Sequence, residues 1–136
     1  MLGVVLLTIA AVLHGYWAIA NNPKGITLAV PQKNGAPAFV PTRVATFLVA
    51  ICLAAMAGLL ASSIGWLPKA STAFWPKIAL WLCAVIFALR AIGERHYVGM
   101  LKTVRNSRFA QLDDLLFTPA CLLLSTIFIV TAMMIA

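Results

Sequence analysis

The chain has 136 residues, of which 63% are hydrophobic and only 10% are charged, whereas soluble proteins carry about 25% charged residues. Ten lysines and arginines against three acidic residues give a net charge of +7. In a soluble domain this excess would suggest nucleic-acid binding, but here the basic residues flank apolar runs, where membrane orientation and anionic lipid account for them. The composition therefore indicates a membrane protein and argues against a nucleic-acid partner.

Four apolar runs dominate the sequence and cover residues 1–20, 44–66, 73–93 and 115–136. A helix of about 20 residues crosses roughly 30 Å of hydrocarbon, because it rises about 1.5 Å per residue. In lipid only helices and closed barrels satisfy every backbone amide, and runs this long without alternation are helical. The sequence therefore predicts an all-α, four-transmembrane-helix bundle that forms a single domain over residues 1–136.

The first run resembles a secretory signal, because Leu2 to Leu13 form an apolar core and Ala18 to Ala20 have the A-x-A form. It lacks a basic leading region, however, and Tyr16 and Trp17 crowd the cleavage position. We therefore expect a retained membrane span.

Orientation follows from the basic residues, because an even number of spans places the first and third connections on the same side. That side carries seven of them, namely Lys24, Lys33, Arg43, Arg95, Lys102, Arg105 and Arg108, against Lys69 and Lys77 on the other. The positive-inside rule then predicts cytoplasmic first and third connections and both termini outside. The first connection is rich in proline and glycine, which break regular structure, so we expect an ordered or partly mobile connector and not a fifth element. In the third, Val98, Leu101 and Val104 recur every three residues, which indicates a short interfacial helix ending near Asn106.

The cysteines and small residues are interpreted structurally. Cys52, Cys83 and Cys121 lie in three different spans without C-x-x-C spacing, so the sequence predicts no disulfide, no metal and no cofactor. Gly58 lies in a small-residue stripe with Ala54 and Ser62, and such stripes let helices approach closely.

Polar residues near the cytoplasmic ends of the spans are the candidate site. His14 lies about 20 Å along the first helix, too deep for its short side chain to reach the interface, so it needs a partner inside the bundle. Arg90 can snorkel to the interface or pair with Glu94 one turn later.

The fourth span begins with acidic residues. Asp113 and Asp114 are expected to cap this helix, and Thr118 either caps the helix at Pro119 or precedes a kink there. Because the connectivity gathers these helix ends at one side, we expect one cytoplasm-facing polar cluster. Its members are His14, Tyr16, Trp17, Arg90, Glu94, Tyr97, Arg108 and Asp113.

Three segments also resemble a known family: "LHGYWA" near the start, "RAIGERHYVG" leaving the third span, and "FAQLDDLLFTPACL" entering the fourth. These segments are similar to the bacterial membrane proteins of domain-of-unknown-function family 3995. The resemblance covers nearly the whole chain and implies a four-span protein of a bacterial cytoplasmic membrane, without an activity or cofactor. Phe117 stands where the family pattern allows tyrosine, so a hydroxyl-dependent role there is in doubt.

Three functions are compatible with these features. The first is binding or transport of a small ligand, ion or lipid headgroup at the polar cluster, with membrane lipids as partners and a homodimer needed to enclose a pathway. The second is an accessory or assembly subunit of a larger membrane complex. The third, a membrane enzyme using His14 and Asp113, has the least support, because the sequence contains no nucleophile motif, metal-ligand spacing or phosphate-binding loop.

Overall fold

The fold is that of a computed structural model, which describes residues 1–20, 30–33, 36–68 and 74–135. Within this described part of the chain, four helical segments are long and apolar enough to cross a membrane, and the prediction of an all-α four-span protein is confirmed. They are α1 (Leu2–Ala20), α3 (Arg43–Ser63), α4 (Trp75–Ile92) and a continuous helical segment over Arg108–Met134. The last segment consists of α5 (Arg108–Leu112), the π-helix η1 (Asp113–Phe117) and α6 (Thr118–Met134).

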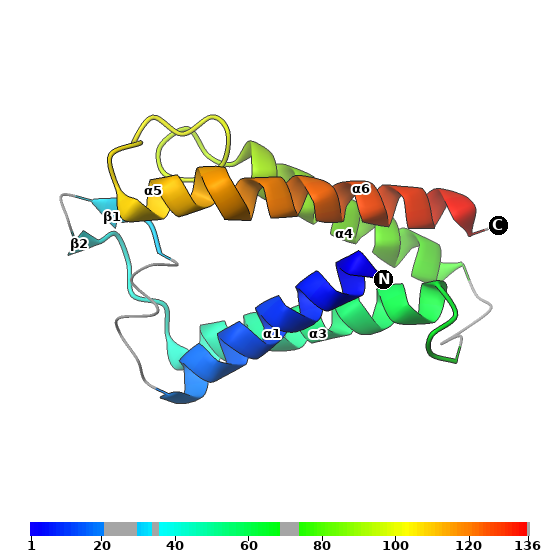
Figure 1. The fold of residues 1–136 in the computed structure, drawn as a ribbon. Coiled ribbons are helices and arrows are strands. Elements are labelled where there is room, and N and C mark those ends of the chain that lie inside the picture. The colour runs from blue at the N-terminus through cyan, green and yellow to red at the C-terminus, as the bar shows by residue number, and fades with distance from the viewer. Residues whose placement is uncertain (21–29, 34–35, 69–73, 136) are drawn as a thin grey trace.

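The helices form two antiparallel pairs, α1 with α3 and α4 with α6 (Figure 1). The pairs meet toward the end that carries both termini and lie farther apart toward the end that carries the first and third connections. The shared core lies where they meet and contains Leu7, Leu60, Leu80, Phe87 and Phe128. Gly3 lies against Leu60 of α3 and Ile127 of α6, so the start of α1 is wedged between the pairs.

The helix ends follow from local sequence. Thr42 caps α3, because its hydroxyl accepts a hydrogen bond from the amide of Ala45 at 3.2 Å. Pro76 lies in the first turn of α4, where its missing N–H costs nothing. The hydroxyl of Ser107 accepts from the amide of Ala110 and caps α5. The fourth span therefore begins seven residues before the predicted start at 115, and the expectation that Asp113 and Asp114 cap it is wrong.

The π-helix η1 has a clear local cause. Pro119 has no N–H, and in a regular α-helix its ring would clash with the carbonyl of Leu115. Over Asp113–Phe117 the helix widens, and the amide of Thr118 donates to the carbonyl of Asp113, five residues earlier. The widened turn accommodates Pro119 without breaking the helix, so Thr118 is not its side-chain cap.

Two expectations about the connections are also wrong. The first connection contains a short antiparallel hairpin, β1 (Gln32–Lys33) and β2 (Ala36–Pro37). Asn34-Gly35, which lie outside the described residues, form the dipeptide that favours tight hairpin turns, and this signal outweighs the prolines around it. The third connection, residues 93–107, has no helix and consists of turns and bends.

Candidate functional site

The carboxylate of Asp113 is the centre of the only fully buried acidic site among the described residues. It accepts three hydrogen bonds: from Nη2 of Arg90 at 3.0 Å, from the amide of Gly99 at 2.7 Å and from Nζ of Lys102 at 3.0 Å. Hydrogen bonds to an ionised acceptor are about twice as strong as those between neutral groups. Asp113 thus joins α4, the third connection and the start of the fourth span.

Lys102 enters this site from the third connection and is almost completely buried, with 2% of its surface exposed. Its ammonium group contacts both Asp113 and Asp114, so the two carboxylates share one cation. Arg105 lies at the rim, with Nη1 at 3.8 Å from Asp114. We refer to Arg90, Lys102, Arg105, Asp113 and Asp114 as the charged cluster.

Two glycines let the third connection carry Lys102 inward. Gly93 (φ +73°) ends α4 and Gly99 has φ +79°, a backbone region that residues with a Cβ rarely adopt. A Cβ on Gly99 would lie 2.6 Å from backbone atoms of Gly93 and from the carbonyl oxygen of Ala91. The connection crosses back over the end of α4 at this point, and the amide of Met100 donates to the carbonyl of Ala91 at 3.0 Å. The last carbonyls of α4 are thereby satisfied by the connection itself.

The electrostatics of the cluster follow from its burial. Removing two charges from water is costly, and their attraction offsets this cost only when the remaining lone pairs and protons are hydrogen-bonded. Asp113 meets this condition, because each of its oxygens has a donor. The charged cluster is therefore a clamp: its hydrogen bonds hold the third connection against the α4/α6 pair in one orientation.

Two buried polar atoms in this region have no partner among the described residues, namely Nη1 of Arg90 and Oγ1 of Thr118. Both residues bond to Asp113 through other atoms: Arg90 donates to its carboxylate and the amide of Thr118 donates to its carbonyl. Leaving a buried hydroxyl unpaired costs about 1–3 kcal/mol. The unpaired hydroxyl of Thr118 therefore lowers the free energy of unfolding.

The outward face of the same end is cationic. Arg95, Arg105 and Arg108 are exposed, and about a third of the Arg90 side chain is exposed. Asp113 faces inward, and the charge of Asp114 is neutralised by Lys102. Exposed Glu94 is then the one acidic residue of this end that has no basic partner among the described residues.

The structure brings together only part of the predicted polar cluster. Arg90 and Asp113 are in contact, as the connectivity suggested. Glu94 does not pair with Arg90, because α4 ends at Ile92 and the next residues turn away from the helix axis. Arg108 is exposed and forms no ion pair with the described residues. The ring of Tyr97 lies near that of His96, with the ring centroids 6.2 Å apart.

The three candidates on α1 lie apart from the charged cluster. α1 packs on α3, and this pair separates from α4/α6 toward the end that holds His14, Tyr16 and Trp17 (Figure 1). His14 bonds to the carbonyl of Ala10 within its own helix at 2.8 Å and contacts Trp17 edge-on. Tyr16 is exposed. The single cluster expected from the connectivity is therefore two separate groups.

Sequence reasoning missed Lys102, the most buried cation of the charged cluster. Its spacing placed it on the polar side of an expected interfacial helix, where a lysine would face lipid headgroups. The available signal was the pair Gly93 and Gly99 on either side of a short polar segment, which indicates a backbone that turns back on itself.

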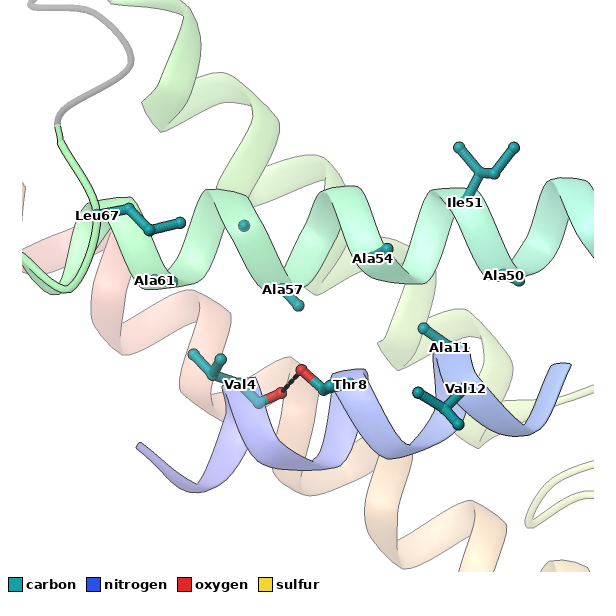
Figure 2. A pocket seen from close by; sticks show the side chains of 11 residues that line it. Val4, Thr8, Ala11, Val12, Ala50, Ile51, Ala54, Ala57, Ala61 and Leu67 are labelled. Carbon is teal, nitrogen blue, oxygen red and sulfur yellow. Dashed lines mark hydrogen bonds between the residues drawn. The ribbon is translucent and has the colours of Figure 1, made fainter. Parts of the chain in front are cut away.

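A second feature is an open apolar groove of about 530 Å³ between α1 and α3 (Figure 2). Its α3 side is lined by small residues, among them Ala50, Ala54, Ala57 and Gly58. A Cβ on Gly58 would meet nothing within 4 Å, so Gly58 does not form the tight contact within the chain that its stripe suggested. This face of the α1/α3 pair has no partner within the described residues.

The described residues contain no group of three His, Cys, Asp or Glu side chains that could hold a metal ion. Comparison with protein families matches residues 7–128 to DUF3995, a protein family of unknown function. The chain belongs to this family. Comparison of this DUF3995 member with curated proteins gave no match, and neither did comparison with solved structures.

Proposed function

We propose that this DUF3995 protein binds a phosphate-bearing anion, the headgroup of an anionic membrane lipid or a small anion of the same chemistry, at the charged end of the α4/α6 pair. The observation that carries this proposal is that both aspartates of this end are already paired with cations of the charged cluster. Asp113 is paired with Lys102 and Arg90, and Asp114 contacts Lys102 and, at 3.8 Å, Arg105, so neither aspartate is paired with Arg95 or Arg108. Arg95 and Arg108 are exposed and have no ion pair among the described residues, and Arg105 is exposed beside its contact with Asp114, so these arginines can meet an anionic partner.

Arginine suits this role because its planar guanidinium offers several N–H donors to a phosphate group. Each basic residue near an anionic leaflet contributes about 1 kcal/mol, which is roughly fivefold in affinity. The charged cluster supports the site indirectly, because it fixes the connection that carries Arg95 and Arg105.

The proposal is tested on purified protein by native mass spectrometry with phosphatidylglycerol, phosphatidylcholine or inorganic phosphate added. We expect retention of phosphatidylglycerol over phosphatidylcholine, and roughly fivefold weaker binding for each of Arg105→Gln and Arg108→Gln. Lys77→Gln removes one charge on α4 toward the opposite end and is the matched control. Competition by inorganic phosphate would identify a small anion as the source, whereas equal retention of both lipids would remove the proposal.

For its location we propose a bacterial cytoplasmic membrane, with both termini outside and the charged cluster on the cytoplasmic side. Seven of the basic residues lie in the first and third connections or at the helix residue that directly follows them, and this bias supports the orientation. Lys33→Cys and Arg105→Cys should be labelled from the same side by an impermeant thiol reagent in cells. Labelling from opposite sides would contradict the orientation.

The alternative function is that of an accessory or assembly subunit, which the groove between α1 and α3 favours. We propose a transmembrane helix of a partner subunit as its occupant, because small residues let two helix backbones approach closely in lipid. Gly58→Leu would place a side chain at the groove, and the first atom of that side chain has room, since a Cβ at this position meets nothing within 4 Å. Loss of a co-purifying membrane protein in Gly58→Leu, but not in Lys77→Gln, supports this alternative; a lone monodisperse protein in mild detergent counts against it.

A further inference from the structure

The α1 group of His14 and Trp17 is not used by the function proposed above. Its chemistry begins with a single hydrogen bond, between Nδ1 of His14 and the carbonyl oxygen of Ala10 at 2.8 Å. A carbonyl oxygen only accepts, so Nδ1 carries the proton. In the neutral ring Nε2 is then a lone-pair acceptor.

The position of His14 places its ring below the end of the helix. It lies six residues before the end of α1 at Ala20, which is about 9 Å along the helix and too far for its short side chain to reach past the helix end. His14 is also seven residues after Leu7, so both occupy the same face of α1. Leu7 is fully buried in the shared core, whereas His14 is only half-buried, because the helix pairs separate toward its end.

Trp17 supplies the complementary group. Its ring lies edge-on to the imidazole with centroids 5.2 Å apart and an interplanar angle of 60°. The indole Nε1–H is a donor with no acceptor among the described residues, and Nε2 of His14 likewise has no donor there. Neither atom is fully enclosed by protein. The two neighbouring rings thus each carry one polar atom without a partner among the described residues, and in hydrocarbon such atoms gain from a ligand that pairs with them.

We propose that His14 and Trp17 bind the hydroxyl group of an amphiphile dissolved in the membrane, an alcohol or a phenol. A hydroxyl matches both atoms, because its O–H donates to Nε2 of His14 while its oxygen accepts from the indole Nε1–H of Trp17. A carbonyl or an ether satisfies only Trp17, and an ammonium group satisfies only His14. The half-buried rings open the site to the acyl region, so the apolar part of the ligand remains in lipid.

The tautomer is tested first. Protein labelled with ¹⁵N in its histidines, in zwitterionic bicelles, should show His14 protonated at Nδ1 and unprotonated at Nε2. A ring protonated at Nε2 alone overturns the proposal, because it leaves no acceptor for a hydroxyl.

Binding is tested with radiolabelled 4-decylphenol and its methyl ether, 4-decylanisole, on protein in phosphatidylcholine nanodiscs. We expect saturable binding of the phenol and none of the ether, which has the same shape without the donor. Trp17→Phe keeps an aromatic ring and should weaken phenol binding roughly two- to tenfold, the effect of one hydrogen bond. His14→Phe should abolish it, and His96→Phe, in the exposed third connection, is the matched control.

Equal binding of phenol and ether, or binding unchanged in both α1 variants, overturns the proposal. If His14→Phe fails to fold, Trp17→Phe and the histidine ¹⁵N shift of the unaltered protein still decide the question. The result is independent of the anion site, because the probes are uncharged.

Discussion

The two helix pairs are held together by different interactions. In the α4/α6 pair polar contacts cross between segments: the charged cluster joins α4 to the start of the fourth span, and the hydroxyl of Ser125 donates to the carbonyl of Ala84 at 2.9 Å. In the α1/α3 pair every side-chain hydrogen bond of the described residues returns to its own helix or cap, as Thr8 does to Val4 and Ser63 to Leu59. The α4/α6 pair is thus held by directional polar contacts between its segments, whereas the α1/α3 pair is held by the packing of apolar surfaces.

This difference has a physical consequence in lipid. A hydrogen bond between helices fixes their register, because displacement leaves a polar group unpaired in hydrocarbon. Small residues permit close approach but fix the register only through van der Waals contact. The α4/α6 pair is thus a defined platform, while the α1/α3 pair keeps an open face. Substitutions in each pair test this contrast.

The largest effect is expected for Asp113→Asn. It leaves Lys102 buried with one partly exposed carboxylate, and removing one partner of a buried ion pair costs about 3–5 kcal/mol. Thermal unfolding in detergent measures the loss. Asp114→Asn should cost clearly less, because Asp114 is 45% exposed. Equal effects of the two variants would contradict the central position of Asp113.

The next effect is expected for Gly99→Ala. Its Cβ would meet three backbone atoms at 2.6 Å and the residue would keep a positive φ, so we expect a loss of about 2–4 kcal/mol. Gly15→Ala in α1 is the control, because nothing lies within 4 Å of its Cβ position. That variant should be neutral or gain up to about 1 kcal/mol from helix propensity. Chemical unfolding in mixed micelles compares them.

Two hydroxyls on α6 should show effects of opposite sign. Ser125→Ala removes a bond that crosses to α4 and should lower the free energy of unfolding by about 1 kcal/mol. Thr118→Val removes a buried hydroxyl without a partner among the described residues and should raise it by about 1 kcal/mol. Loss of stability in Thr118→Val would show that its hydroxyl has a partner in the membrane.

The smallest effect is expected in the α1/α3 pair. Ser63→Ala and Thr8→Val remove hydroxyls that bond only within their own helices, so each should change stability by less than about 0.5 kcal/mol. The same unfolding assay measures them beside Ser125→Ala. A loss as large as that of Ser125→Ala would remove the contrast between the pairs.

The fold was predictable because length and apolarity alone decide whether a segment crosses a membrane. The contact between Arg90 and Asp113 was also predictable, since connectivity brings those helix ends together. The separation of His14 from them was not, because helical periodicity gives the buried face of α1 and not the angle at which one pair leaves the other. Lys102 was missed for a different reason: an isolated lysine beside a membrane is expected to face headgroups, and only the folded connection buries it.

The π-helix makes the number of residues between Asp113 and Pro119 as important as their identity. The five-residue wide turn covers about the rotation that four residues cover in an α-helix, where each residue turns by about 100°, so the same residues wound as a regular helix would turn Asp113 away from α4. Relatives that keep this spacing are therefore expected to keep the wide turn, whereas relatives with one residue fewer are expected to hold the same aspartate against α4 from a regular helix.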